Sequence, residues 1–237
     1  MILTEQDRRS FLLRSLALAG SALLAGHAAS IVPASRRLFR SGRLARNPVA
    51  ATFEAFHPRA PLPTTPLWTP AGPRRFSDLK NKVTLVSLWA EFCVPCLQEA
   101  HDLGELRRRH IRQGFDVLAV NLDDAQNPAR ARRRLDQVDA ATLPCWVEQG
   151  GGTIGPLLAT PHGGHGFTLP CNLLMNARGQ IVGRAFGTHL IKDDPVPTGA
   201  QGGAAGGAPG KADATWWSTP AADEFAALLA KSALDQL

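Results

Sequence analysis

Two cysteines separated by two residues form the strongest chemical signal in the sequence. Cys93 and Cys96 follow an apolar run, residues 83–88, whose β-branched side chains predict a buried strand. Apolar residues at helical spacing follow the pair, at Leu97, Ala100, Leu103 and Leu106. This order places both sulfurs at a helix N-terminus, whose free N–H groups and partial positive charge favour a thiolate at the first sulfur. The sequence therefore predicts a dithiol redox site.

Two other uses of the cysteine pair compete with redox chemistry. Structural zinc needs four ligands, normally from a second C-x-x-C or an H-x3-5-H motif. Cys145 and Cys171 stand alone, and His162 and His165 are separated by two residues within a glycine-rich stretch. A purely structural disulfide at a helix start would be a poor cross-link. Redox chemistry is therefore favoured, and it requires neither a metal nor an organic cofactor.

The basic surplus of the chain lies near its beginning. The 237 residues carry a formal net charge of +6. Up to Pro48, eight arginines against Glu5 and Asp7 account for all of it, so the rest of the chain is neutral. A nucleic-acid-binding domain should carry its own basic face. The short basic run at residues 130–134 is interpreted as a solvated helix face, and no nucleic-acid partner is expected.

Residues 1–29 have the features of an export signal. Arg8 and Arg9, followed by Ser, Phe and Leu, resemble a twin-arginine signal. The apolar stretch at 16–25 is shorter than the about 20 residues that span a bilayer, and small residues place cleavage after Ala28 or Ala29. An uncleaved membrane anchor is the alternative. Either way we expect a periplasmic domain in an oxidising compartment, where a working reductant needs an electron supply.

Composition divides the rest of the chain. Residues 30–60 are rich in Arg, Ala and Pro without clear periodicity, which predicts a disordered tether whose arginines could lie near anionic lipid. Residues 61–237 are predicted to form the folded domain. Within it, residues 188–214 are rich in Gly, Ala and Pro and too poor in apolar side chains to fold, so a flexible insertion is expected there.

The predicted elements around the cysteine pair come in a simple order. A proline-rich segment, residues 61–73, predicts an edge hairpin and leads into a helical turn at 76–79. A second helix begins at Asn127 and runs to about residue 138, and a last helix begins at Thr219. Further strands are predicted at residues 115–122, 144–147, 171–175 and 180–186, the last two as an antiparallel hairpin.

This order, with Trp-Ala-Glu-Phe-Cys-Val-Pro-Cys at residues 89–96, resembles the thioredoxin fold and its active-site signature. Phe92 stands where that family usually has a second Trp. The chain is most similar to the exported branch typified by TlpA, ResA and the cytochrome c maturation thioredoxins, because of its proline-rich hairpin, its extra α–β pair at 127–147, and Glu99. The resemblance covers about residues 61–187 and the final helix. It implies an α/β, thioredoxin-like fold: a central mixed sheet flanked by helices, with an N-terminal hairpin and an inserted α–β unit.

The resemblance also implies roles for individual residues. Cys93, at the exposed helix start, attacks a substrate disulfide, and Cys96 resolves the mixed disulfide. Glu99, with a pKa raised by partial burial, relays a proton to or from Cys96. A carboxylate on the helix surface is the alternative for Glu99. Pro170 is expected to follow a cis peptide bond and to expose the backbone of Leu169 to the substrate.

Three further residues complete the expected substrate-binding site: Trp89, Phe92 and Pro95. Trp89 and Phe92 are expected to pack beside the sulfurs and limit access of water, although core packing explains Trp89 equally well. Ser87 stands six residues before the first cysteine, where thioredoxin itself has a buried Asp. This departure leaves Glu99 as the acid/base candidate and argues against a cytosolic-type thioredoxin.

Cys145 and Cys171 are not expected to form a second disulfide. In the inferred topology their strands lie three strand spacings apart, which is roughly 14 Å. A disulfide needs Cα atoms within about 7 Å. Two small, buried core residues are expected instead.

The resulting hypothesis is an exported protein-disulfide reductase. By resemblance, its substrates are disulfide-bearing proteins, such as those with haem-attachment or copper-site cysteines, and a membrane thiol carrier re-reduces it. A dithiol oxidase is one alternative, against which the Val94-Pro95 spacer argues, since oxidases often have His there. A copper(I) metallochaperone is another, with help from His162, His165 or His189. A peroxiredoxin is disfavoured because the P-x-x-x-[ST]-x-x-C pattern is absent around Cys93.

Overall fold

The computed structural model describes residues 37–60, 64–79, 81–123, 127–148, 154, 169–187 and 215–231. The predicted export signal, the beginning of the predicted tether and the predicted insertion at 188–214 lie outside these ranges. So do His162, His165 and His189. None of the helices in the described ranges is both long and apolar enough to cross a membrane.

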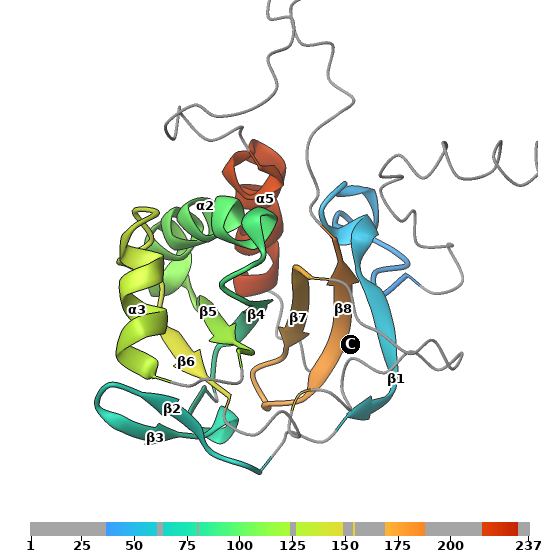
Figure 1. The fold of residues 1–237 in the computed structure, drawn as a ribbon. Helices are drawn as coiled ribbons and strands as arrows, with labels where there is room; N and C mark the ends of the chain where they lie inside the picture. Colours follow the sequence, from blue (N-terminus) through green and yellow to red (C-terminus); the bar gives the residue numbers. More distant parts are fainter. Residues whose placement is uncertain are drawn as a thin grey trace, which may run out of the picture. The chain divides into compact units, whose positions relative to one another are not determined.

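Within the described residues, one mixed sheet of eight strands forms the centre of the domain (Figure 1), in the order β1-β8-β7-β4-β5-β6-β2-β3. The strands β4, β5 and β6 run parallel to one another, and β7 pairs antiparallel with β4. The bounds are β1 Glu54–Ala60, β2 Leu67–Thr69, β3 Gly72–Arg74, β4 Val83–Trp89, β5 Phe115–Asn121, β6 Cys145–Val147, β7 Cys171–Met175 and β8 Ile181–Phe186. The predicted α/β, thioredoxin-like fold with its inserted α–β unit is confirmed.

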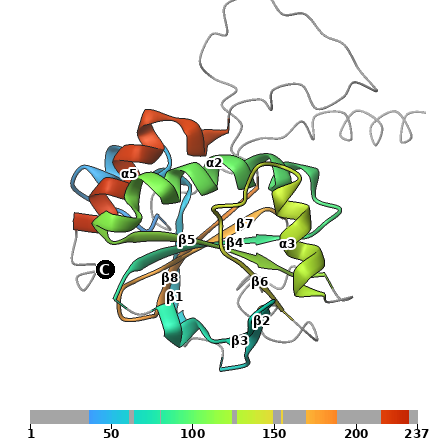
Figure 2. The same ribbon diagram turned by 90° about the vertical axis from the view of Figure 1, so that its left-hand side faces the viewer.

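Helices cover one face of this sheet, and the β2–β3 hairpin lies on the other side (Figure 2). The helices are α2 Val94–His110, α3 Pro128–Asp136 and α5 Pro220–Lys231, with short 3-10 turns η1 Leu44–Arg46, η2 Ala50–Thr52, η3 Phe76–Leu79, η4 Ile111–Gln113 and η5 Trp216–Ser218. The predicted start of α3 is confirmed, because the Asn127 side chain accepts a hydrogen bond from the Ala129 N–H.

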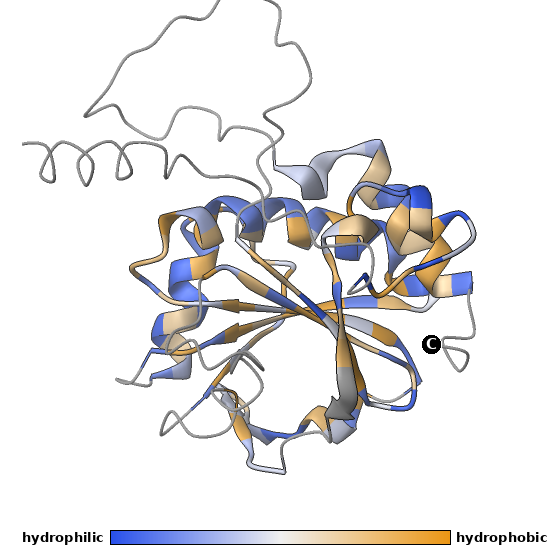
Figure 3. Cartoon of the chain, turned by 90° about the vertical axis from the view of Figure 1, so that its right-hand side faces the viewer, coloured by the Kyte–Doolittle hydropathy of each residue, from blue (hydrophilic) through white to orange (hydrophobic). Residues whose placement is uncertain are grey.

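The central strand β4 is buried on both faces, which explains its nearly continuous apolar sequence. Because side chains alternate along a strand, Leu85 and Trp89 enter the core beneath the helices, whereas Val86 and Leu88 enter the core on the hairpin side. Figure 3 shows strands rich in apolar residues at the centre of the domain and helices that carry both apolar and polar residues.

The structure differs from the predicted tether over residues 37–60. The strand β1 pairs antiparallel with β8, at the edge of the sheet. Phe39, Val49 and Phe53 are buried in the core beneath the helices, and the Phe53 ring stacks on Phe225 with 5.5 Å between centroids. Residues 37–60 consist of two 3-10 turns and one strand, so their apolar residues follow no single period. For this reason the sequence of this segment resembles that of a disordered tether.

A partly buried ion pair joins β1 to β8. Arg184 Nε lies 2.6 Å from Glu54 Oε1, and the two side chains are 5% and 21% exposed. The Arg184 guanidinium also lies over the rings of Phe56 and Phe186, at 5.1 and 5.2 Å from their centroids. The strand β1 is thus tied to the sheet by charge as well as by backbone pairing.

Beyond residues 188–214, which lie outside the described ranges, the chain contacts α2 through Thr215. The Thr215 N–H and hydroxyl both donate to the Asp102 carboxylate on α2, at 3.2 and 2.6 Å. Trp217 is buried, and α5 follows. The Asp223 carboxylate on α5 accepts hydrogen bonds from Arg109 Nε and His110 Nε2, both at 2.8 Å.

The attachment of α5 through Asp223 should depend on pH. Burial alone would raise the pKa of Asp223, but the hydrogen bonds from His110 and Arg109 outweigh burial and lower the pKa below its ordinary value of 3.8. A carboxyl group with a lowered pKa stabilises the fold at neutral pH, and this contribution disappears as pH falls through the folded-state value. We expect Asp223→Asn to lower Tm by about 2 °C at pH 7 and to have little effect near pH 2.5, as measured by circular dichroism. A difference in Tm that does not change with pH would contradict this assignment.

Candidate active site

The strand β4 delivers the chain to the cysteine pair at the N-terminus of α2. Cys93 is the N-cap residue of α2 and forms a disulfide with Cys96, and Pro95 lies in the first helical turn. The N–H of Cys96 donates a hydrogen bond to Cys93 Sγ at 3.3 Å. The predicted arrangement, in which a helix N-terminus presents an N–H group to the first sulfur, is therefore confirmed.

The immediate neighbours of Cys93, rather than Cys93 itself, are exposed. Cys93 is 6% exposed and Cys96 3% exposed, whereas Phe92 and Val94 are 80% and 62% exposed. The prediction that Phe92 packs beside the sulfurs is wrong, because Phe92 lies in the turn that leaves the core between β4 and α2. Trp89, in contrast, is buried in the same core cluster as both cysteines.

Asp123, which the sequence patterns do not single out, holds the turn before the cysteines. Its Oδ2 accepts hydrogen bonds from the Glu91 N–H at 2.8 Å and from Asn121 Nδ2 at 2.6 Å. In addition, the Leu122 N–H donates to the Trp89 carbonyl at 2.9 Å. The active-site turn is thus fixed to the carboxyl end of β5. Polar residues directly after a buried parallel strand are the sequence signal that could have identified this contact.

Glu99 is completely buried on α2, three residues after Cys96. This burial excludes the alternative of a carboxylate on the helix surface. Ser87 and Asn172 are direct cross-strand partners on β4 and β7, and both are buried. Since Leu85 and Leu174 belong to the core beneath the helices, strand alternation places Ser87 and Asn172 on that same side. Polar groups therefore lie under α2 within an otherwise apolar core.

A cis peptide bond joins Leu169 to Pro170, which confirms the predicted cis-proline. Pro170 directly precedes β7, and β7 begins opposite the end of β4, because Cys171 pairs with Leu88. Pro170 and the cysteine turn therefore lie at the same end of the sheet (Figure 1). The Gly187 N–H donates to the Pro170 carbonyl at 2.8 Å and fixes this segment to the end of β8.

Cys145 and Cys171 are free, buried thiols, as predicted. The sheet order separates their strands, β6 and β7, by three spacings. Cys171 belongs to the core on the hairpin side, whereas the Cys93–Cys96 disulfide belongs to the core beneath the helices. The sheet therefore lies between Cys171 and the disulfide.

These two thiols should be inert in the folded protein. Burial raises the pKa of Cys145 to about 12, and it also raises the pKa of Cys171. Because the thiolate is the reactive form, iodoacetamide at pH 8 should modify neither thiol in the native oxidised protein. After reduction of the native protein it should modify Cys93, whose thiolate the α2 N-terminus stabilises, and after reduction in denaturant it should modify all four cysteines. Mass spectrometry of the alkylated peptides measures this, and rapid native labelling of Cys171 would contradict the burial argument.

Among the described residues, no group of three or more His, Cys, Asp or Glu side chains could hold a metal ion. The three histidines considered as additional copper ligands, His162, His165 and His189, lie outside the described ranges.

Residues 59–184, more than half of the chain, match the model of the AhpC/TSA family. The chain belongs to the AhpC/TSA family. The matched range includes the cysteine pair, Glu99 and Pro170, together with β2 to β7. The part of the chain that resembles this family is therefore the part that builds the candidate active site.

Individual relatives of this AhpC/TSA-family chain are distant. It is 24% identical over 110 residues to the thiol-disulfide oxidoreductase ResA of a Bacillus cereus strain, covering 46% of this chain and 58% of that protein. It is 24% identical over 120 residues to the ResA of Geobacillus kaustophilus, covering 51% and 63%. The chain thus spans less than two thirds of the length of these curated relatives. A solved thiol:disulfide interchange protein of the thioredoxin family from Chlorobium tepidum TLS is 20% identical, with a TM-score of 0.44, covering 56% of this chain and 89% of that one.

Proposed function

We propose that this protein is an extracytoplasmic thiol–disulfide oxidoreductase that reduces disulfides in other proteins. The observation that carries the proposal is the Cys93–Cys96 disulfide at the N-terminus of α2, with cis-Pro170 at the same end of the sheet and Glu99 buried one turn away. Membership of the AhpC/TSA family and relatives named thiol-disulfide oxidoreductase support it.

The first step of the reaction is an attack by the reduced protein on its substrate. The Cys93 thiolate attacks one sulfur of the substrate disulfide, whose S–S bond breaks while a new bond to Cys93 forms. The leaving substrate sulfur takes up a proton and becomes a thiol. The N-terminal N–H groups of α2 stabilise the Cys93 thiolate before attack, since one of them already donates to Cys93 Sγ in the oxidised state.

The second step releases the reduced substrate. Cys96 loses its proton and attacks the sulfur of Cys93, which re-forms the Cys93–Cys96 disulfide and expels the second substrate sulfur as a thiolate. Two electrons have then passed from the protein to the substrate. Glu99 is the proposed acceptor of the Cys96 proton, because residues three apart on a helix are neighbours and burial favours the uncharged form of a carboxyl group.

Substrate binding is proposed at the rim of the cysteine pair. The exposed side chains of Phe92 and Val94 offer an apolar surface on both sides of Cys93. The backbone of Leu169, beside Pro170, is the proposed site for strand-like pairing with a substrate segment. Trp89 and Pro95 support this rim, Trp89 from within the core and Pro95 from the first turn of α2.

The cellular setting is part of the same proposal. A twin-arginine signal in residues 1–29 would export the protein to the periplasm, with or without a remaining membrane tether. Reduction in an oxidising compartment needs a dithiol donor, and a membrane thiol carrier supplies those electrons in the proposal. Cysteines that await haem or copper in respiratory proteins are the proposed substrates, since they must be reduced before they bind either group.

Peroxide reduction is not proposed, although the family model carries the name AhpC/TSA. The P-x-x-x-[ST]-x-x-C pattern of peroxiredoxins would require proline and Ser or Thr where this chain has Val86 and Ala90. Neither requirement is met around Cys93.

The equilibrium potential of the Cys93–Cys96 pair tests the proposed direction of electron flow. The protein lacking residues 1–29 is titrated in dithiothreitol and glutathione buffers, and its free thiols are counted in each state. We expect a potential near or below about −220 mV with two thiols cycling. A potential near about −120 mV would identify a dithiol oxidase instead. Tight copper(I) binding that protects both thiols, without redox cycling, would favour the metallochaperone.

A further inference from the structure

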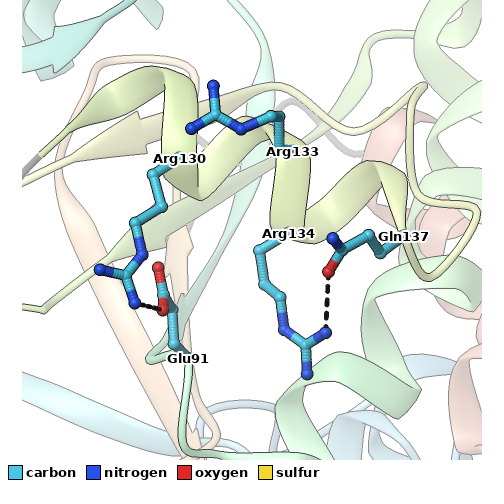
Figure 4. Close-up of a pocket in the computed structure, with 5 residues that line it drawn as sticks. All are labelled: Glu91, Arg130, Arg133, Arg134 and Gln137. Atoms are coloured by element: carbon cyan, nitrogen blue, oxygen red, sulfur yellow. Dashed lines mark hydrogen bonds and ion pairs between the residues drawn. The ribbon is translucent and has the colours of Figure 1, made fainter.

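A groove lies beside the active-site turn, on its α3 side. It is lined by Glu91 from that turn, by three arginines of α3 and by the C-cap residue of that helix, and it has a volume of about 200 Å³. These α3 and C-cap residues are Arg130, Arg133, Arg134 and Gln137 (Figure 4), and we call this feature the arginine groove. Because Glu91 precedes Cys93 by two residues, their Cα atoms lie within about 7.6 Å of each other. The groove is therefore adjacent to the redox disulfide.

The lining residues of α3 form one continuous stripe. Their positions, at residues 130, 133, 134 and 137, follow the i, i+3, i+4, i+7 spacing of a single helix face. Ala131 and Leu135 occupy the buried face of the same helix. The sequence pattern predicts that the basic run at residues 130–134 is a solvated helix face. The structure refines this prediction, because part of the run lines the groove beside the active-site turn.

The charges of the arginine groove are unequal. Arg130 Nη2 lies 2.6 Å from Glu91 Oε2, and this pair joins the two walls (Figure 4). Arg134 donates to the neutral Gln137 side chain at 2.9 Å. Within the part of the chain that the structure describes, neither Arg133 nor Arg134 lies within ion-pair distance of a carboxylate. Three guanidinium groups therefore line the groove against one carboxylate.

The arginines in the last turn of α2 are balanced differently. Arg107, Arg108 and Arg109 each pair with a carboxylate, at 2.7 to 2.8 Å. The unbalanced positive charge is therefore specific to the α3 stripe, because the arginines at the end of α2 are neutralised by carboxylates.

The shape of the groove fits a carboxylate-bearing chain. The Glu91–Arg130 pair demonstrates that a carboxylate can be accommodated there, and guanidinium groups match carboxylate geometry through two parallel hydrogen bonds. The stripe from Arg130 to Gln137 is about 10 Å long, at a rise of about 1.5 Å per residue. An extended polypeptide covers that length with about three residues.

We propose that the arginine groove binds a short acidic segment of the protein whose disulfide is reduced at Cys93–Cys96. This inference rests on the proposed function and adds the chemistry by which a substrate is selected. A polypeptide is favoured because the groove is adjacent to the redox pair, so one bound chain can present both its acidic residues and its disulfide. A nucleic acid is disfavoured because the chain beyond Pro48 has no net positive charge.

Three disulfide-closed peptides test the proposal. They differ only in the three residues beside the disulfide, which are Asp-Glu-Asp, Ser-Asn-Ser or Lys-Lys-Lys, and single-turnover reduction by the pre-reduced protein is followed in stopped flow. At low ionic strength we expect the acidic peptide to react about tenfold faster than the neutral peptide, and the lysine peptide to react more slowly. The preference should shrink at 0.5 M salt, because salt screens exposed charges. In the double variant Arg133→Gln/Arg134→Gln, the acidic-to-neutral ratio should fall to about twofold.

The matched control removes the same charge elsewhere. Arg108→Gln/Arg112→Gln alters the last turn of α2 and the η4 turn that follows it, about 20 Å along the helix from the cysteines, and should keep the wild-type ratio. If both double variants lower the ratio equally, net charge rather than the groove is responsible and the proposal is wrong. Circular dichroism and Tm verify that each variant is folded.

The remaining outcomes separate this inference from the proposed function. If the wild-type protein reduces none of the peptides, the proposed reductase function fails. If it reduces all three at equal rates, only the groove proposal fails. Co-sedimentation with phosphatidylglycerol vesicles that requires Arg133 and Arg134, together with equal peptide rates, would identify the groove as a membrane-binding surface and overturn the acidic-segment proposal.

Discussion

The Cys96→Ser variant should stop at the mixed disulfide and remain covalently joined to its substrate. Cys93 can still attack, but no second thiolate is present to displace it from the substrate sulfur. Steady-state reduction of a disulfide peptide should fall by about three orders of magnitude or more. Non-reducing electrophoresis and intact mass spectrometry should show a one-to-one adduct of protein and peptide, which dithiothreitol dissociates.

Two further variants make this prediction specific. Cys93→Ser should lose turnover and form no adduct, since the group that attacks first is gone. Cys171→Ala should turn over like the wild type, because the Cys171 thiol lies on the other side of the sheet from the disulfide. If Cys93→Ser formed the adduct and Cys96→Ser did not, the two cysteines would have the opposite roles.

The largest loss of stability should come from removing Glu54. Its carboxylate pairs with Arg184, whose side chain is 5% exposed, so Glu54→Ala leaves a buried guanidinium without its carboxylate. Removing one partner of a fully buried ion pair costs about 3 to 5 kcal/mol, and for this partly buried pair we expect a loss of about 2 kcal/mol. Urea unfolding of the oxidised protein, followed by tryptophan fluorescence, should therefore show a markedly lower transition midpoint at an unchanged m-value.

The reciprocal change should cost less, about 1 kcal/mol. In Arg184→Met the methionine can still pack against Phe56 and Phe186, and the partly exposed Glu54 carboxylate can be hydrated. Equal losses in the two variants would indicate that packing of the Arg184 side chain, rather than its charge, dominates the junction between β1 and β8.

The parts of the fold that the sequence predicts well are those with a local cause. The apolar run of β4, the helix that follows the cysteines and the Asn127 cap each depend on residues within a few positions of one another. The cis bond at Pro170 and the burial of Glu99 agree with expectations that came from family resemblance.

The features that the sequence does not predict depend on contacts between distant segments. In the sequence, Phe39 and Phe53 lie in a segment that resembles a tether. Their burial depends on packing against β8 and α5, which come more than 120 residues later in the chain. Asp123 becomes part of the site only because β5 ends beside the turn that follows β4. The arginine groove likewise exists because Glu91 and α3 meet across a gap of 39 residues in sequence. Patterns within a few residues of sequence cannot reveal contacts between segments that are distant in the chain.

The hydrogen bonds at Gly187 and Thr215 have a consequence for how this protein can vary. Gly187 is fixed to Pro170, and Thr215 is fixed to Asp102, so both ends of the intervening 188–214 stretch are anchored to the domain independently of what lies between them. The entropic cost of closing a loop rises only by about 0.6 kcal/mol for each doubling of its length. On the prediction that residues 188–214 form a flexible insertion, we therefore expect that lengthening or shortening this stretch leaves the stability of the sheet and the cysteine pair nearly unchanged.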